Sequence, residues 1–319
     1  MGLNKSQNHN GAARLVRRLA SRAWNPRGAP SPERLRGAVA GRFVLVTGAS
    51  HGIGRATAVA LAGAGATVLL VARSGDVLEE LAAQLNGGAA ASGGNGAAGG
   101  HGRAFAYPAD LTDLDAVDAL AQRILAEHGP PDVVVSNAGK SIRRALDRSY
   151  DRFHDFTRTI DVNYLGPVRL LMGLLPAMRA RGSGHVVNVS TIGVLVPPAA
   201  RWSAYTASKA AFDAWVRSMA AETHADGVTA TSLYMALVYT RMSAPTDDFR
   251  FVPGLSPQEA AGLVCRAIVD RPSAITPWWA TASALFGLLA RGPSEALVRR
   301  YDQLLPGARG AARRERARG

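Results

Sequence analysis

The chain has 319 residues, of which 47% are hydrophobic and 19% are charged. This apolar share is enough for a packed core, so a wholly disordered protein is excluded. The one cysteine, Cys265, cannot form an internal disulfide and gives no sign of an oxidising compartment. The longest apolar stretch, residues 278–290, is shorter than the roughly 20 residues of a membrane-spanning helix. The N-terminus lacks the pattern of a secretory signal, and we therefore expect a soluble, cytoplasmic protein.

The net charge of +13 is concentrated at the two ends of the chain. Residues 1–42 carry nine Lys and Arg against one Glu, and residues 291–319 carry eight Arg against three acidic residues. The remaining residues hold 20 basic and 20 acidic side chains, which argues against a core that binds nucleic acid. We predict three parts: a basic N-terminal extension (1–41), a main domain (42–276), and an apolar helix region with a basic tail (277–319).

Strands and helices are predicted to alternate after about 40 irregular residues. In chain order the predictions are strand 43–47, helix 53–64, strand 66–72, helix 77–85, a flexible Gly/Ala-rich loop 87–100, strand 103–107, helix 114–128, strand 132–136, helix 162–181, strand 185–190, helix 204–224 and strand 228–234. Pro176 is expected to kink or end its helix. Ser256 and Glu259 match a capping box that begins a further helix. The alternation predicts an α/β fold with a doubly wound, Rossmann-like parallel sheet in a single domain, with a helical lid and basic terminal extensions.

A glycine-rich run lies between the first predicted strand and the first predicted helix. Its residues are Thr47, Gly48, Ala49, Ser50, His51, Gly52, Ile53 and Gly54. Glycines permit a tight turn and a close approach of the backbone to a pyrophosphate, and the amides at a helix start bind the anion. Such a run is a weak signal alone, but the flanking strand and helix favour a dinucleotide site over an ordinary turn.

The end of the second predicted strand carries an arginine, Arg73, and no acidic residue lies between the glycine run and Asp76. NAD-binding versions of this fold place an acidic side chain here, against the ribose 2′-hydroxyl. Arg73 would instead pair with a 2′-phosphate, with His51 as a second donor. The sequence therefore favours NADPH, and the alternative is that Arg73 is merely solvated at a strand end.

Tyr205 and Lys209 lie four residues apart near the start of a predicted helix, which places both on one helical face. An ammonium beside a phenol favours the phenolate and lowers the pKa of the phenol, as proton transfer near neutral pH requires. Taken alone, a pair with this spacing is usually a solvated surface pair.

The order of these motifs, over residues 42–271, resembles that of the short-chain dehydrogenase/reductase family. The resemblance rests on the glycine run and on Asp110-Leu111, Asn137-Ala138-Gly139, Asn163, the strand 185–191, Tyr205 and Lys209. It implies that Tyr205 protonates the nascent alkoxide, that Lys209 binds the nicotinamide ribose and tunes Tyr205, and that Asn163 holds a proton-relay water. The expected cofactor-binding set is Thr47, Gly48, Ser50, His51, Gly52, Ile53, Gly54, Arg73, Ser74, Asp110, Leu111, Asn137, Ala138, Gly139, Tyr205, Lys209, Val238 and Thr240.

Two positions depart from the pattern of this family. The serine that binds the substrate carbonyl usually stands where this chain has Thr191, although Ser190 is adjacent. Neighbouring strand residues face opposite sides, so only one hydroxyl can face the substrate; Thr191 is favoured and both stay candidates. Met235-Ala236 stands where relatives commonly have Pro-Gly, which affects the expected loop shape.

Residues 137–156, 237–246 and 256–272 are similar to a bacterial branch of the family related to fatty acyl-CoA reductases. The similarity implies NADPH-dependent transfer of hydride to the carbonyl of a hydrophobic substrate, such as an acyl-CoA thioester reduced to an aldehyde. A ketone or secondary-alcohol dehydrogenase would use the same residues. The third alternative is a protein that binds a nucleotide without catalysis. The presence of the complete set Asn163, Tyr205 and Lys209 disfavours it.

Two further segments bear on the substrate. One carries four cations that could meet a CoA phosphate or could pair at helical spacings with Asp147, Asp151 and Asp155; they are Arg143, Arg144, Arg148 and Arg152. The other is the predicted lid between Tyr239 and Ser256, whose apolar side chains could cover a substrate or pack on the body; they are Phe249, Phe251, Val252 and Leu255.

The basic ends leave several interpretations open. Residues 14–24 can form a basic amphipathic helix that lies on an anionic membrane, packs on the body or stays disordered. Residues 309–318 are expected to be a disordered tail. The family resemblance implies a homo-oligomer. No group of metal ligands accompanies Cys265 or the scattered histidines, so we expect no metal site.

Overall fold

The computed structural model describes residues 24–26, 28–91, 102–196, 200–244 and 252–304. Seven strands form one sheet in the order β3-β2-β1-β4-β5-β6-β7, and every pair is parallel. The strands are β1 (Phe43–Thr47), β2 (Thr67–Ala72), β3 (Ala104–Pro108), β4 (Val133–Ser136), β5 (Gly184–Thr191), β6 (Val228–Met235) and β7 (Ala274–Ile275). The order reverses between β1 and β4, which is where ligands bind in open sheets of this kind.

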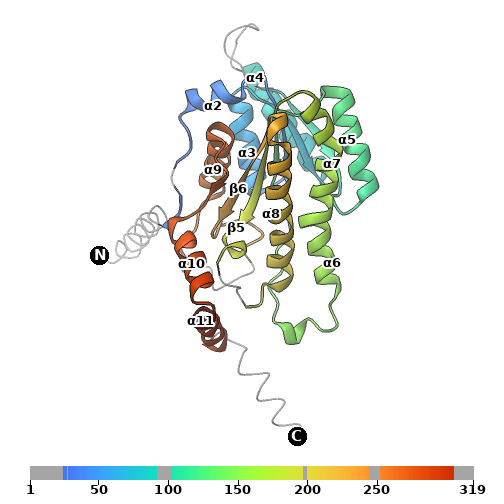
Figure 1. Ribbon diagram of the computed structural model, residues 1–319. Helices are drawn as coiled ribbons and strands as arrows, with labels where there is room; N and C mark the ends of the chain where they lie inside the picture. The colour runs from blue at the N-terminus through green and yellow to red at the C-terminus, as the bar shows by residue number, and fades with distance from the viewer. Residues whose placement is uncertain (1–23, 27, 92–101, 197–199, 245–251, 305–319) are drawn as a thin grey trace, which may run out of the picture.

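Helices cover both faces of the sheet (Figure 1). One face packs on α2 (Pro32–Val39), α3 (Gly52–Gly63), α4 (Gly75–Ala91) and α9 (Pro257–Asp270). The other packs on α5 (Leu114–His128), α7 (Gly166–Ala180) and α8 (Ser203–Thr223). Side chains of one strand alternate between the two cores, so Val44 and Val46 of β1 belong to the first and Leu45 to the second. The predicted doubly wound α/β fold is confirmed.

Several predicted elements differ from the structure. The helix expected at 162–181 begins earlier, because α6 (His154–Ile160) runs through a π-helical turn at Asp161–Leu165 into α7. Pro176 does not end this helix, which continues to Ala180. The short elements α2 and β7 were not predicted, although Ser31 caps α2 and Pro32 begins it. Helix α4 extends to Ala91, into the stretch expected to be a loop, and residues 92–101 lie outside the described residues.

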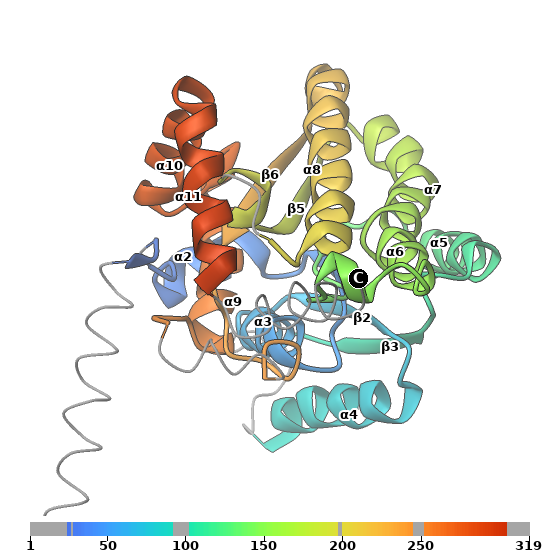
Figure 2. The ribbon, with the colours of Figure 1, turned by 90° about the horizontal axis from the view of Figure 1, so that it is seen from below.

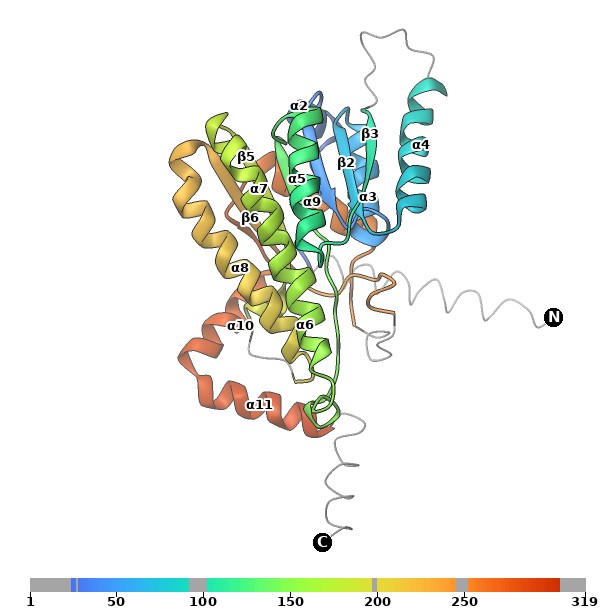
Figure 3. The ribbon, with the colours of Figure 1, turned by 90° about the vertical axis from the view of Figure 1, so that its right-hand side faces the viewer.

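Two helices, α10 (Trp278–Leu289) and α11 (Arg291–Leu304), stand apart from the two helical layers (Figures 2 and 3). An apolar helix was predicted here and is confirmed as α10, whereas α11 was not predicted. The predicted tail 309–318 and residues 14–23 of the predicted basic helix lie outside the described residues. Among the helices that the structure describes, none combines the length and apolar character needed to cross a bilayer.

A buried carboxylate, Asp213, joins α8 to the sheet. It is 2% exposed and accepts hydrogen bonds from Asn188 Nδ2 on β5 (3.2 Å) and from Ser232 Oγ (2.7 Å) and Tyr234 Oη (2.9 Å) on β6. A buried carboxylate is tolerated only when donors surround it, and here two strands, β5 and β6, supply the donors. The network therefore fixes the position of α8 on the sheet.

Replacing this carboxylate should destabilise the fold. We expect Asp213→Ala to lower the free energy of unfolding by about 3 kcal/mol, because three buried donors lose their acceptor. The matched control is Glu222→Ala, at an exposed position of the same helix, which should change it by less than about 0.5 kcal/mol. Urea unfolding followed by circular dichroism measures both values, and equal midpoints for the two variants would contradict this account.

Candidate active site

The predicted site residues gather at the carboxyl ends of β1, β4 and β5, beside the starts of α3 and α8. The glycine run between β1 and α3 turns tightly, with Gly48 at a φ of +68°. A Cβ on Gly54 would lie 2.2 Å from the carbonyl oxygen of Gly48, so no other residue fits there. His51, at the N-cap of α3, makes no capping hydrogen bond with its side chain, and the first turn holds no acidic residue. These features fit the pyrophosphate of a dinucleotide, which the helix start would bind through its amides.

The glycine run is tied to the segment that follows β4. Thr47 Oγ1 accepts hydrogen bonds from the backbone amides of Asn137 and Ala138, both at 3.0 Å. Asn137 Nδ2 donates in return to the Thr47 carbonyl at 2.9 Å. A Cβ on Gly139 would lie 2.9 Å from Asn163 Oδ1 and 3.4 Å from Lys209 Nζ. The structure thus brings together the glycine run, residues 137–139 and the two polar residues expected near the nicotinamide end.

The end of β2 presents Arg73 to solvent. Its guanidinium is 3.8 Å from the Asp110 carboxylate, and the two side chains are 77% and 41% exposed. Asp110 also accepts hydrogen bonds from the amide and hydroxyl of Thr112, which fix the turn after β3. Arg73 therefore stays accessible to an anionic ligand, although its contact with Asp110 was not expected.

A second cation near the glycine run, Arg241, was missed by the sequence analysis. Its guanidinium lies 3.0 Å from His51 Nε2, while His51 Nδ1 lies 3.0 Å from Ser50 Oγ. The loop after β6 reaches the glycine run here, because a Cβ on Gly52 would meet the Thr240 side chain at 3.2 Å. The sequence could have indicated Arg241, because it directly follows Thr240, which was already in the expected cofactor-binding set.

Tyr205 lies near the start of α8 with its phenol beside the Thr191 hydroxyl. Burial raises the pKa of Tyr205 to about 12, and the hydrogen bond with Thr191 acts in the opposite direction. The expectation that the ammonium of Lys209 lowers this pKa is wrong for this structure, since burial dominates. At neutral pH the phenol is therefore protonated and can donate a proton.

Lys209 lies one turn further along α8 and is 6% exposed. Its ammonium donates to the Val189 carbonyl of β5 at 3.0 Å. Burial lowers the pKa of Lys209 to about 8, and the Asp213 carboxylate acts in the opposite direction. The ammonium consequently keeps its charge at neutral pH and loses it as the pH rises through about 8.

Asn163 sits in the π-helical turn and is fully buried. Its Oδ1 accepts from the Lys140 amide at 2.8 Å, and its Nδ2 donates to the Lys140 carbonyl and to Ser208 Oγ, both at 2.9 Å. Because these contacts occupy both ends of the amide, the side chain anchors the segment after β4 to α8.

The two candidate hydroxyls at the end of β5 have different surroundings. Thr191 Oγ1 accepts from the Gly193 amide at 3.2 Å and contacts the Tyr205 phenol. Ser190 is 5% exposed, and its Oγ has no hydrogen-bond partner among the described residues. The geometry brings Thr191, rather than Ser190, to the phenol.

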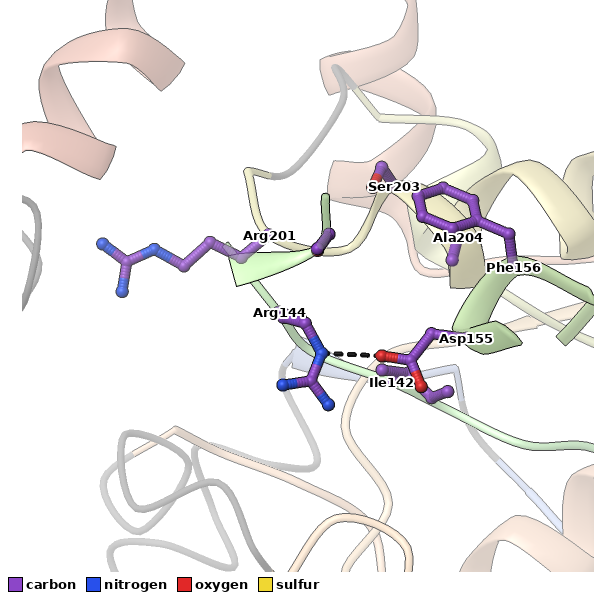
Figure 4. Close-up of a pocket in the computed structure, with 8 residues that line it drawn as sticks. Ile142, Arg144, Asp155, Phe156, Arg201, Ser203 and Ala204 are labelled. Carbon is purple, nitrogen blue, oxygen red and sulfur yellow. Dashed lines mark hydrogen bonds and ion pairs between the residues drawn. The ribbon is translucent and has the colours of Figure 1, made fainter. Parts of the chain in front are cut away.

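A small pocket lies beside the start of α8, with Ser203 and Ala204 in its wall (Figure 4). The Arg144 guanidinium donates to the buried Asp155 carboxylate at 2.6 Å, and Arg152 approaches the same oxygen at 3.4 Å. Burial would raise the pKa of Asp155, but the two arginines outweigh it and hold this pKa below its usual range. Arg144 and Arg152 are thus engaged structurally, which disfavours them as ligands of a CoA phosphate.

The segment between β4 and α6 is not helical as the predicted spacing assumed. Among its residues only Leu146–Arg148 form a short 3₁₀ turn, so the contact between Arg144 and Asp155 spans 11 residues. The ion pairs that were expected for Asp147 and Asp151 at helical spacings therefore have no helix that would bring their partners together.

The predicted lid is described only at its two ends. Residues 236–244 and 252–256 form turns and a bridge between Val238 and Leu255, without a helix, while Phe249 and Phe251 lie outside the described residues. Leu255 is 5% exposed and packs in the core, whereas Val252 is 40% exposed. Within the part of the chain that the structure describes, no group of three or more metal-ligating side chains occurs.

The family model of the short chain dehydrogenases matches residues 42–250. A fatty acyl-CoA reductase of Acinetobacter baylyi is 48% identical over 237 residues, covering 74% of this chain and 76% of the relative. A fatty acyl-CoA reductase of Mycobacterium tuberculosis is 40% identical over 267 residues, covering 83% and 87%. The crystal structure of a metagenomic short-chain oxidoreductase in complex with NADP is 30% identical, with a TM-score of 0.61, and covers 75% of this chain and 97% of its own.

The match of the family model over most of the main domain and the identity to these relatives agree with the fold. The chain belongs to the short-chain dehydrogenase/reductase family of NAD(P)-dependent oxidoreductases.

Proposed function

We propose that this protein is an NADPH-dependent reductase that converts a fatty acyl-CoA thioester into an aldehyde and free CoA. The observation that carries the proposal is the grouping of the Tyr205 phenol with the Thr191 hydroxyl, one helical turn from the Lys209 ammonium. The raised pKa of Tyr205 keeps the phenol protonated at neutral pH. A protonated phenol suits the direction of reduction, in which the carbonyl oxygen must receive a proton. Two relatives named fatty acyl-CoA reductases support the thioester as substrate.

Each residue of the site would have a separate role in this reaction. A bound nicotinamide would supply the hydride that adds to the thioester carbonyl carbon. The Thr191 hydroxyl would hold the carbonyl oxygen, and Tyr205 Oη would give its proton to the oxygen as negative charge develops there. Collapse of the resulting hemithioacetal breaks the carbon–sulfur bond and releases the CoA thiol and the aldehyde. Lys209, charged below about pH 8, would bind the ribose, and Asn163 keeps residue 140 and α8 in place.

The preference for NADPH rests on the cations around the glycine run. Arg73 is exposed at the end of β2, and Arg241 and His51 meet on the other side of the same turn. Arg73, with Ser74 and His51 as in the sequence prediction, would bind the 2′-phosphate, and Arg241 would add charge for the pyrophosphate. The structural relative that contains NADP supports this assignment.

Exposed apolar side chains in the segment between β4 and α6 favour a substrate with a long acyl chain. The segment between β4 and α6 exposes Leu146, Tyr150 and Phe153, which are 62%, 79% and 73% exposed. These side chains lie in the stretch that also carries Arg148, which is exposed and stays a candidate for a CoA phosphate. A ketone or secondary-alcohol dehydrogenase is the second candidate function, since it would use Thr191, Tyr205 and Lys209 in the same way.

The remaining assignments are part of the proposal. We assign residues 1–41 to the basic N-terminal extension, 42–276 to the catalytic domain and 277–319 to the C-terminal helices and basic tail. Helix α2 of this extension packs on the main domain, so peripheral membrane contact is proposed only for the residues that precede it. We also propose a cytoplasmic location, with which the single cysteine agrees, because it cannot form an internal disulfide. A homo-oligomer is supported by a groove between α7 and α8 that Met172, Trp215 and Met219 line.

A substrate panel tests the proposed reaction. With NADPH, we expect turnover of long-chain acyl-CoAs, release of a free thiol and formation of an aldehyde. Tyr205→Phe should lower kcat by about 10²–10⁴-fold, because the proton donor is lost, while NADPH binding measured by fluorescence stays unchanged. Turnover of hydrophobic ketones without any turnover of acyl-CoAs would overturn the thioester assignment and favour the second candidate.

The choice of cofactor depends on Arg73. We expect Arg73→Asp to weaken NADPH binding by about 100-fold or more, since the 2′-phosphate would face a carboxylate instead of a guanidinium. NADH binding should change by less than about threefold, because an exposed charge contributes little to it. Calorimetric titration with both cofactors measures the two values, and equal losses would contradict the assignment.

Single substitutions distinguish the roles of the two hydroxyls at the end of β5. Thr191→Ala should lower kcat by roughly 100-fold, the effect of losing one donor to the developing oxyanion. Ser190→Ala, the matched control one residue away, should keep kcat within about threefold, because the Ser190 hydroxyl has no hydrogen-bond partner among the described residues. The reverse ranking in steady-state kinetics would assign the role to Ser190.

A further inference from the structure

The last two helices expose an unusually apolar surface. Helix α10 contains no charged residue, and in its twelve residues only Ala280 is buried. The exposed apolar side chains, called here the α10–α11 surface, are Trp278, Leu285, Phe286, Leu288 and Leu289 from α10 and Leu297 and Tyr301 from α11. Leu288 and Leu289 are 79% and 88% exposed. Exposed apolar side chains gathered on two adjoining helices mark a candidate interaction site.

Two cationic stretches of the sequence adjoin residues that contact or form this surface. Trp24 packs on Trp279 of α10 with ring centres 5.1 Å apart, and Trp279 Nε1 donates to the Trp24 carbonyl at 2.7 Å. Residues 1–23, which lead to Trp24, carry five Lys and Arg and no acidic residue. Residues 305–319, which follow α11, carry five Arg and one Glu. One cationic stretch therefore precedes a residue that packs on α10, and the other follows α11 in the sequence.

We propose that the α10–α11 surface binds the face of a membrane that contains anionic lipids. Apolar side chains beside basic segments are the combination that such a surface attracts, through burial in the acyl region and attraction to the headgroups. With twelve residues, α10 is about 18 Å long, too short for the roughly 30 Å hydrocarbon layer, so it lies in the interface and does not cross it. A second copy of the chain is disfavoured as the partner, because docking would bring four cationic stretches together.

The surface lies at the active-site end of the molecule. Arg201 pairs with Asp302 of α11 at 2.9 Å, and Arg201 precedes Tyr205 by four residues. Figure 3 shows α11 beyond the carboxyl edge of the sheet, the edge at which the site lies. A membrane bound here would hold the edge of the sheet that carries the site close to lipid, which suits the acyl substrate of the proposed function. Only this functional benefit of membrane contact rests on the proposed function.

Vesicle binding by the full chain tests the inference. We expect co-sedimentation with vesicles of equal parts phosphatidylcholine and phosphatidylglycerol, and at least about tenfold weaker binding to pure phosphatidylcholine or at high salt. The double variant Leu288→Glu with Leu289→Glu should bind at least about tenfold more weakly than the parent. The control, Val59→Glu with Leu114→Glu, changes the charge equally on α3 and α5, at positions 44% and 40% exposed, and should bind like the parent.

Three outcomes would overturn the inference. The first is equal vesicle binding by the two double variants. The second is light scattering in which Leu288→Glu with Leu289→Glu dissociates an oligomer, which would assign the surface to a second copy. The third is stronger vesicle binding after deletion of residues 1–23, which would show that this segment covers the surface. Binding is measured without cofactor or substrate, so its failure and that of the substrate panel are distinguishable.

Discussion

Helix α8 carries a lysine and an aspartate four residues apart, and the neighbouring strands hold both of them. The Lys209 ammonium donates to the Val189 carbonyl, and the Asp213 carboxylate accepts from three donors on β5 and β6. Burying two opposite charges costs free energy of desolvation, which these contacts and their mutual attraction offset. The position of Tyr205 follows from this constraint, because one rigid helix carries all three residues. Thr191, at the end of β5, is brought to the phenol by the strand that also supplies Val189 and Asn188.

Most of the fold could be predicted because local patterns and long-range packing agree. The buried strands have continuous apolar sequences, and a parallel sheet covered on both faces needs them. The capping box at Ser256 and Glu259 forms as expected, with both of its hydrogen bonds present. The grouping of the glycine run with residues 137–139 was expected only from the family resemblance. The structure gives its physical basis, since β1 and β4 are adjacent and the loops after parallel strands meet at one edge.

The parts that the sequence did not reveal depend on contacts between distant residues. Asp213 looks like a surface residue of an amphipathic helix, and its burial depends on donors 19 to 25 residues away. The contact of Arg241 with His51 spans 190 residues and arises from the loop after β6. The pKa of Tyr205 was expected to fall because a lysine was near in sequence, but its degree of burial is a property of the folded chain. Helix α11 has a mixed, strongly charged sequence, which resembles that of the tail that follows it.

The π-helical turn at Asp161–Leu165 acts as a one-residue insertion within a long helix. One extra residue per turn sets a π-helical turn apart from an α-helix, so deletion of a single residue here would make one continuous α-helix. Because about five π-helical residues turn the chain as far as about four α-helical residues, α6 and α7 would keep nearly the same phase. The deletion would instead remove the bulge that carries Asn163, and with it the hydrogen bonds of Asn163 to Lys140 and Ser208. The extra residue is therefore a requirement of the site, and the packing of the two helices on the sheet does not depend on it.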